Sequence, residues 1–161
     1  MSELNFDEPS ALNDVAKFHR TFNLPVLDSP TVPDPARCAL RINLLQEELD
    51  ELKDAIGNDS IAGIADALAD LQYVLSGAIL EFGLGSKFKE LFDEVQRSNM
   101  SKVCPDVITA EETVAFYAAK DGTKGFIRES EEGFLVYRES DKKVLKSTKY
   151  SPADLERILN L

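Results

Sequence analysis

Hydrophobic positions up to about residue 100 recur at the three- and four-residue intervals of amphipathic helices. A proline-rich connector, Leu24 to Pro35, separates the first expected helix from the second and cannot be helical throughout. Asp34-Pro35 has the form of an N-cap followed by proline at the first helical position, and Gly57 is a typical residue after a helix end. The helices expected from this pattern cover residues 11–22, 35–56, 60–82 and 86–97.

The pattern changes after residue 102 to short stretches rich in β-branched and aromatic residues, separated by turn signals such as Asp121-Gly122. They predict a small antiparallel meander with strands at residues 113–119, 125–129, 133–137 and 144–146. Ser151-Pro152 begins a last short helix that reaches Asn160. We expect a mainly α fold, a helical bundle with a small antiparallel β insert near the C-terminus. The expected domains are a helical core at 1–102, a β-meander insert at 103–146 and a C-terminal helix at 147–161 that returns to the core.

The composition restricts the partners that such a fold could have. The 161 residues are 43% hydrophobic, which suits one folded domain with a small appendage. A net charge of −11 argues against nucleic acid as a partner. An acidic protein can still bind a phosphorylated ligand when a divalent cation lies between the two sets of negative charge.

Location follows from the cysteines and from the N-terminus. Cys38 and Cys104 form neither a disulfide framework nor a zinc-binding spacing, and Met1 to Pro9 lack the features of a signal peptide. We therefore expect a cytoplasmic protein. The apolar stretch Ile61 to Leu80 is long enough to raise the question of a membrane span. Asp66 and Asp70 within it would each cost about 2.5–3.5 kcal/mol near a bilayer centre, so we expect a buried helix and no membrane partner.

Carboxylates form the main candidate site. On the second helix, Glu47, Glu48 and Glu51 fall within an arc of about 100° at the edge of the apolar stripe. That stripe is expected to be the core, and it consists of Leu45, Leu49, Leu52 and Ile56. The alternative for the glutamates is a solvated acidic face, which is common on helices.

The third helix favours a metal over that alternative. Asp66 and Asp70 lie one turn apart on a helix that is otherwise almost entirely apolar, and two buried like charges need a counter-charge. A short link should make the two helices antiparallel, so that a bound cation is shared with the glutamates. All-oxygen ligation selects Mg²⁺, with Mn²⁺ as the alternative ion. The competing explanation is that the two aspartates are neutralised by Arg37, Arg41 or Arg97.

These motifs resemble those of a known family. Residues 47–51, EELDE, followed by residues 65–74, ADALADLQYV, resemble the MazG-like all-α NTP pyrophosphatase superfamily, whose signature is E-E-x-x-E followed by E-x-x-D. Residues 18–22, 94–102, 141–146 and 150–155 resemble the branch that contains phosphoribosyl-ATP pyrophosphohydrolase-like proteins and a MazG-like dUTPase.

The resemblance implies roles for individual residues. Glu47, Glu48, Glu51 and Asp70 would be metal ligands, and one of these glutamates would help to activate water. Asn99, Lys102 and Lys146 would contact the substrate phosphates, although Lys146 could equally be a solvated surface lysine. The family also forms dimers or dimers of dimers, so we expect a homo-oligomer.

The chain departs from the family pattern in two places. Ala67 stands where the signature has its second-helix glutamate, and Asp66 is expected to replace that ligand. Residues 103–140 have no counterpart in the compact members of the family.

The expected function is Mg²⁺-dependent hydrolysis of a nucleoside triphosphate to the monophosphate and pyrophosphate, with a dUTP-like pyrimidine deoxynucleotide favoured by the resemblance. The enzymatic alternative is phosphoribosyl-ATP pyrophosphohydrolysis. The alternative that is not enzymatic is a helical binding or regulatory module with a solvated acidic cluster.

Overall fold

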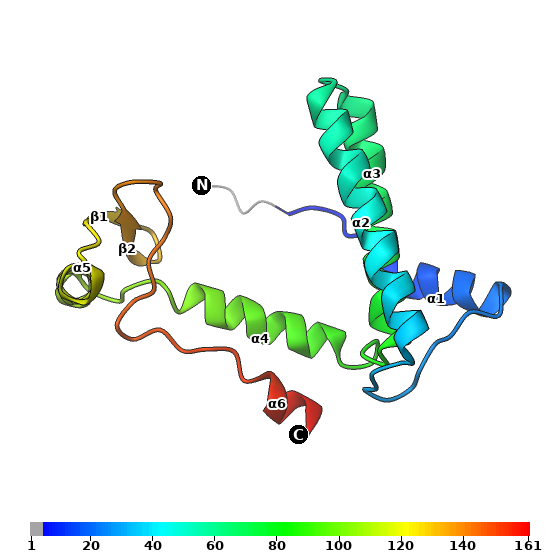
Figure 1. Ribbon diagram of the computed structural model, residues 1–161. Coiled ribbons are helices and arrows are strands. Elements are labelled where there is room, and N and C mark those ends of the chain that lie inside the picture. Colours follow the sequence, from blue (N-terminus) through cyan, green and yellow to red (C-terminus); the bar gives the residue numbers. More distant parts are fainter. Residues whose placement is uncertain (1–4) are drawn as a thin grey trace. The chain divides into compact units, whose positions relative to one another are not determined.

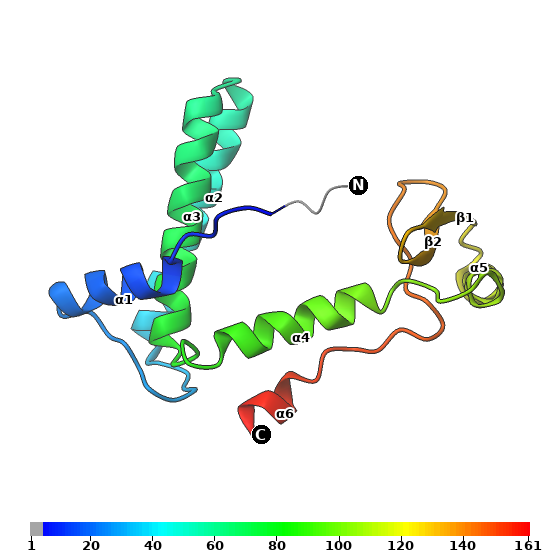
Figure 2. The ribbon, with the colours of Figure 1, turned by 180° about the vertical axis from the view of Figure 1, so that it is seen from behind.

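The computed structural model describes residues 5–161, and these form six helices and one two-stranded antiparallel sheet (Figures 1 and 2). The predicted mainly α fold with a small sheet near the C-terminus is confirmed. The helices are α1 Ala11–Thr21, α2 Pro35–Gly57, α3 Ile61–Glu81, α4 Phe88–Met100, α5 Val107–Asp121 and α6 Leu155–Leu159, and the strands are β1 Gly125–Ser130 and β2 Gly133–Arg138.

The chain divides into two compact units, one that ends at Phe88 and one that spans Lys89–Leu161. Helix α4, which the sequence pattern places with the helical core, falls in the second unit apart from its first residue. Each unit is described below by itself.

The first unit is built on an antiparallel hairpin of α2 and α3, which run side by side in both views (Figures 1 and 2). Local signals set its ends, because Asp34 accepts hydrogen bonds from two backbone N–H groups at the start of α2, and Ser60 accepts one at the start of α3. Two close approaches fix the register. A Cβ atom at Gly63 would lie 3.1 Å from the Cβ of Ala55, and one at Gly77 would lie 2.6 Å from Arg41 Nη1.

The prediction that Leu45, Leu49, Leu52 and Ile56 of α2 form the core is partly wrong. Leu49 and Ile56 are 41% and 60% exposed, whereas the side of α2 that faces α3 includes Arg41 and Glu48. The N-terminal half of α3 is also more open than expected, because both Asp66 and Asp70 are exposed. Helix α3 is long and apolar enough to span a membrane by length and composition, but its last six residues are buried within the unit.

A buried ionic network lies at the end of the hairpin where α2 begins and α3 ends. Glu81 is 1% exposed and accepts hydrogen bonds from Arg37 and Arg41 of α2. Arg41 Nη2 lies 3.3 Å from Nε2 of the buried His19, and Nδ1 of that histidine contacts the Pro25 carbonyl oxygen at 2.7 Å. Burial opposes ionisation of Glu81, but the two arginines outweigh it and lower the pKa of its carboxyl. The network therefore joins α1, α2 and α3.

In the second unit, the strand expected at residues 113–119 is wrong, since these residues lie in α5. The Asp106 carboxylate caps this helix by accepting a hydrogen bond from Thr109 N at 2.7 Å, and Gly122 ends it with φ 73°. Buried or half-buried residues recur at helical intervals: Thr109, Ala110, Thr113, Val114 and Tyr117. The β-branched and aromatic content of this stretch thus reflects one packed face of a helix, and Asp121-Gly122 is a helix end rather than a hairpin turn.

The two strands expected at residues 125–129 and 133–137 form as predicted. Strands β1 and β2 pair antiparallel, with Phe126 opposite Tyr137, and they pack with α5 around a core of Cys104, Ala110, Val136 and Leu145. The strand expected at residues 144–146 is reduced to a single bridge between Tyr137 and Val144.

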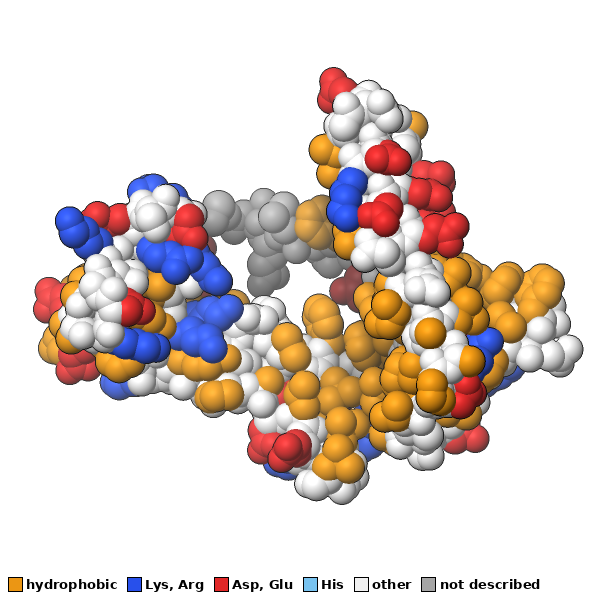
Figure 3. All heavy atoms as spheres, in the orientation of Figure 1, with side chains coloured by type: hydrophobic (Ala, Val, Ile, Leu, Met, Phe, Trp, Pro, Cys, Tyr) orange, Lys and Arg blue, Asp and Glu red, His pale blue; other side chains and the backbone are white. Residues whose placement is uncertain are grey.

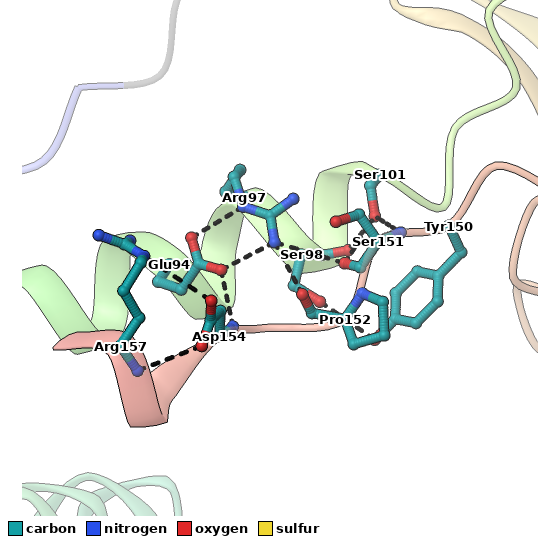
Figure 4. A network of polar contacts seen from close by, with 9 residues as sticks. All are labelled: Glu94, Arg97, Ser98, Ser101, Tyr150, Ser151, Pro152, Asp154 and Arg157. Carbon is teal, nitrogen blue, oxygen red and sulfur yellow. Dashed lines mark hydrogen bonds and ion pairs between the residues drawn. The ribbon is translucent and has the colours of Figure 1, made fainter. Parts of the chain in front are cut away.

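The C-terminal segment is bound along α4 by polar contacts (Figure 4). Glu94 accepts a hydrogen bond from Asp154 N at 2.8 Å, and Arg97 donates to the Pro152 carbonyl oxygen at 2.9 Å. Ser101 Oγ accepts a hydrogen bond from Ser151 N at 2.9 Å. Helix α6 is accordingly short, and the residues from Ser151 to Asp154 that were expected to be helical form this extended contact instead.

Candidate functional site

The five predicted metal ligands gather on one side of the α2–α3 hairpin. Glu47, Glu51, Asp66 and Asp70 each directly precede a residue that faces the other helix, so in an antiparallel pair they project to the same side. Glu48 itself faces α3 and is half-buried, and the register places it near Asp70. Acidic side chains are visible along this hairpin in Figure 3.

The neighbouring carboxylates are close enough to Glu48 to change its pKa. Partial burial raises the pKa of the Glu48 carboxyl, and the negative charges of four neighbours raise it further. These neighbours are, in decreasing order of effect, Glu51, Asp70, Glu47 and Asp66. Glu48 is therefore the centre of the acidic cluster.

The competing explanation, neutralisation of the aspartates by arginine, is not observed. Arg37 and Arg41 pair with Glu81, and Arg97 pairs with Glu94. Across residues 5–161, none of the five clustered carboxylates has a Lys, Arg or His partner. The cluster thus holds negative charge that no side chain in the described part of the chain compensates.

The donor set suits a hard cation, although the described residues contain no group of three carboxylate, histidine or cysteine side chains already arranged around a metal position. All five donors are carboxylates, which Mg²⁺ and Mn²⁺ prefer, and Mg²⁺ commonly keeps several waters between itself and protein oxygens. Ala67 is 2% exposed and faces α2, so the position of the missing family glutamate points toward Glu51. The chemistry of these residues, rather than their present arrangement, fits a hydrated divalent ion.

An apolar pocket of about 270 Å³ adjoins the carboxylates within the first unit. Leu44 lies one turn before Glu48, and Val74 lies one turn after Asp70, so the pocket continues along the same side of the hairpin. Phe18 and Tyr73 meet edge to face with ring centroids 5.6 Å apart. Arg41 also lines the pocket, and its Nε is a buried nitrogen without a hydrogen-bond partner among the described residues. The lining comprises Val15, Phe18, His19, Leu24, Arg37, Leu40, Arg41, Leu44, Tyr73 and Val74.

The three predicted phosphate-binding residues also come together, within the second unit. Lys102 Nζ donates to Asn99 Oδ1 at 2.7 Å, and Lys146 Nζ lies 4.2 Å from the centre of the Tyr150 ring. A hydrogen bond from Ser98 lowers the pKa of Tyr150, and Lys146 and then Lys102 lower it further, so the two ammonium groups act on one phenol. A larger open cavity of about 550 Å³ lies elsewhere in this unit, near Lys124 and Arg138, and contains none of the predicted residues.

Reasoning from the sequence missed Tyr150, Ser98, Glu81 and the pocket. Tyr150 had no local signal, because residues 145–150 are not helical and its hydroxyl bonds to Ser98, 52 residues away. Glu81 is a single acidic residue after a long apolar run, a pattern that predicts a paired buried carboxylate. The pocket depends on contacts between α1 and the hairpin, and no local sequence pattern predicts these contacts.

Comparison with known proteins agrees with these features. Residues 15–99 match the model of the phosphoribosyl-ATP pyrophosphohydrolase family. An uncharacterised protein of Acanthamoeba polyphaga mimivirus is 27% identical over 106 residues, which cover 61% of this chain and 41% of that protein. The chain thus spans well under two thirds of the length of this relative.

The family match covers α2 and α3 completely, includes every carboxylate of the acidic cluster, and ends within α4. Lys102, Lys146 and Tyr150 lie outside it. The match extends over more than half of the chain, and it contains the two helices that carry the motifs. The chain therefore belongs to the phosphoribosyl-ATP pyrophosphohydrolase family, within the MazG-like all-α superfamily that its motifs resemble.

Proposed function

We propose that this protein hydrolyses a nucleoside triphosphate to the monophosphate and pyrophosphate, and that it requires Mg²⁺. The observation that carries the proposal is the acidic cluster around Glu48, whose charge no Lys, Arg or His side chain among residues 5–161 compensates. Family membership supports pyrophosphohydrolase chemistry, and the cluster supports a requirement for a divalent ion.

Glu47, Glu48, Glu51, Asp66 and Asp70 would hold the ion. Mg²⁺ would supply positive charge that offsets the charge of the phosphates, and it would make water more acidic. Glu48 is proposed as the base because it is half-buried, faces α3 and lies at the centre of the carboxylate cluster. It takes a proton as the water oxygen attacks the α-phosphorus. A new P–O bond forms, the bond from the α-phosphorus to the bridging oxygen breaks, and pyrophosphate leaves with that oxygen.

Asn99, Lys102 and Lys146 are proposed to bind the phosphates. Neither lysine has a carboxylate partner among the described residues, so both ammonium groups can bind an anion. In a protein of net charge −11, two such lysines that both act on the Tyr150 phenol favour a phosphate-binding role over that of solvated surface residues.

The apolar pocket is proposed to hold the base. Its volume of about 270 Å³ lies near the lower end of small-molecule pockets, about 300–1,000 Å³, and suits one nucleobase rather than a whole nucleotide. The resemblance of the motifs favours a dUTP-like pyrimidine deoxynucleotide, and phosphoribosyl-ATP stays the enzymatic alternative.

Release of pyrophosphate from a panel of nucleotides tests the proposal. The panel should include dUTP, dCTP, dTTP, dATP and phosphoribosyl-ATP, each with Mg²⁺ and with a chelator. We expect Mg²⁺-dependent release that is fastest with a pyrimidine deoxynucleotide. Fastest release from phosphoribosyl-ATP would select the enzymatic alternative, and no release from any nucleotide would select a helical binding module.

A further inference from the structure

Tyr150 lies at the centre of the cluster of positive charge in the second unit. Its hydroxyl oxygen accepts a hydrogen bond from Ser98 Oγ at 3.0 Å, and Ser98 is buried on α4 (Figure 4). Because the phenol oxygen already accepts this bond, its own hydrogen remains free to be donated. Among the described residues, no acceptor takes that hydrogen.

Lys146 also lies against the ring of Tyr150. The lysine Nζ is 4.2 Å from the ring centre, within the range of a cation–π contact, and it has no carboxylate partner among residues 5–161. The hydrogen bond from Ser98, the charge of Lys146 and a hydrogen bond from Lys146 lower the pKa of the phenol, and the charge of Lys102 adds to the effect. One side chain thus stands beside both ammonium groups.

Contacts on both sides hold Tyr150 in this position. Ser151, the next residue, exchanges two hydrogen bonds with Ser101 Oγ, at 2.9 Å and 3.2 Å. Tyr150 N donates to the Ser147 carbonyl oxygen at 2.9 Å, which forms a turn between Lys146 and Tyr150. The segment cannot carry the tyrosine away from α4 without breaking these bonds.

We propose that Tyr150 is a further phosphate-binding residue, whose hydroxyl donates to a phosphate oxygen and whose ring holds Lys146 beside Lys102. The proposal rests on the proposed function, since it adds a residue to the phosphate-binding group of the second unit, Asn99, Lys102 and Lys146. The ligand class is a linear polyphosphate, either free or as part of a nucleotide. A free phenol hydrogen and two ammonium groups match several oxygens of such a chain.

The test uses the full-length chain and inorganic tripolyphosphate, with binding measured by calorimetry. Tyr150→Phe keeps the ring and removes the donor, and it should weaken binding roughly ten-fold, the scale of one lost hydrogen bond to a charged group. Lys146→Met should weaken binding at least as much. Tyr137→Phe and Lys142→Met are matched controls from the β2 strand and the segment that follows it, and they should bind as the unmodified chain does.

Two further readouts separate binding from a merely structural role. For the favoured nucleotide, Tyr150→Phe should raise KM by a similar factor with little change in kcat. Tripolyphosphate should raise the phenol pKa by neutralising the lysines. This appears in near-ultraviolet absorbance as a signal that is lost in Tyr150→Phe and kept in Tyr137→Phe.

Unchanged tripolyphosphate binding and unchanged KM in Tyr150→Phe would overturn the role of Tyr150, even if the chain hydrolyses nucleotides. Conversely, tripolyphosphate binding that depends on Tyr150 in a chain without hydrolytic activity would support the site and refute the proposed enzymatic function. A Tyr150→Phe variant that changes only the unfolding temperature would likewise overturn the proposal.

Discussion

Glu48 combines two properties that oppose one another. Its position between α2 and α3 brings it close to four other carboxylates, which is useful for holding a cation and costly without one. Partial burial and then the charges of these carboxylates raise the pKa of Glu48, so the charged form is disfavoured in the folded chain relative to the unfolded chain. The cost is absent at a pH below the ordinary glutamate pKa and is complete above the raised pKa.

Glu48→Gln should therefore reduce turnover by about 100-fold or more, through loss of the base, and should raise the unfolding temperature of the metal-free chain at neutral pH. The stabilisation should disappear at a pH below about 4.3, where the glutamate is protonated in both states. Thermal melts at several pH values with a chelator, together with kinetic assays, measure both effects.

Asp50→Asn is the matched control on the same helix. Asp50 bonds to Lys53 and Gln46, its pKa is lowered, and it lies outside the cluster. Its substitution should leave turnover unchanged and should not raise the unfolding temperature. If Glu48→Gln destabilised the chain at neutral pH, the uncompensated cluster would be the wrong description.

Asp66 is expected to act in place of the family glutamate, because position 67 of this chain is alanine. Asp66→Asn should increase the Mg²⁺ concentration needed for half-maximal activity by about ten-fold, the scale of changes close to a metal. Ala67 points toward α2, so adding Ala67→Glu should restore part of the activation while lowering stability by overpacking. Unchanged Mg²⁺ dependence in Asp66→Asn would remove Asp66 from the site.

At the scale of elements, α5 shows how one hydroxyl joins distant segments. Thr113 is fully buried, donates to the Thr109 carbonyl oxygen at 2.7 Å and accepts a hydrogen bond from Thr148 N at 3.1 Å. Thr113→Val keeps the shape and leaves that N–H without its acceptor. Amide exchange at Thr148 should accelerate by roughly ten-fold, the scale of one hydrogen bond. Thr113→Ser keeps the hydroxyl and should leave the exchange nearly unchanged.

Glu94 is the second link between elements, and its effect depends on pH. Hydrogen bonds from Arg97 and from Asp154 N lower the pKa of its carboxyl to about 2. A lowered pKa stabilises the folded chain above the ordinary glutamate value, and this contribution is lost as pH falls through about 2. The Asp154 amide shift in NMR spectra should titrate with that midpoint, and Glu94→Gln should abolish the titration. A midpoint near 4 would mean that the contact between α4 and the C-terminal segment is not held by this carboxylate.

Local sequence signals were sufficient to predict a helix where its capping residues lie within the helix ends. Asp34-Pro35 and Ser60 gave the starts of α2 and α3 because the capping bonds are made within a few residues. Helix α5 was missed because Thr-Val-Ala-Phe-Tyr also favours a strand, and only the helical spacing of its buried face decides between the two. Proximity of the carboxylates followed from a short connection between two helices. The positions of Tyr150 and Arg41 could not be predicted from local sequence, because they depend on partners 40 or more residues away.

At the scale of the whole molecule, the two sides of the α2–α3 hairpin differ in character. Opposite the carboxylates, large apolar residues recur every seven positions on both helices and are exposed, Ile61 by 79%. Each directly follows a residue that faces the other helix, so both stripes lie on one side. The stripes consist of Ile42, Leu49 and Ile56 on α2 and Ile61, Leu68 and Leu75 on α3.

We propose that this side forms the interface of a homodimer or a dimer of dimers. Heptad spacing on both helices matches the packing of helical bundles, and a second copy of the hairpin would bring an equal apolar surface. The acidic clusters of the two copies would then lie on the outer sides, where their charges do not oppose association.

Leu49→Glu combined with Leu68→Glu should therefore give a monomer at micromolar concentration, because the two changes place four carboxylates in the proposed dimer interface. Both leucines are exposed in the single chain, so the helical circular-dichroism signal of each subunit should persist. Ile108→Glu on α5 is the control, since Ile108 is also apolar and exposed but lies outside the stripes. Multi-angle light scattering should find the control variant and the unmodified chain as the same oligomer. A strictly monomeric unmodified chain would contradict the proposal, and an oligomer that survives the double substitution would place the interface on another surface.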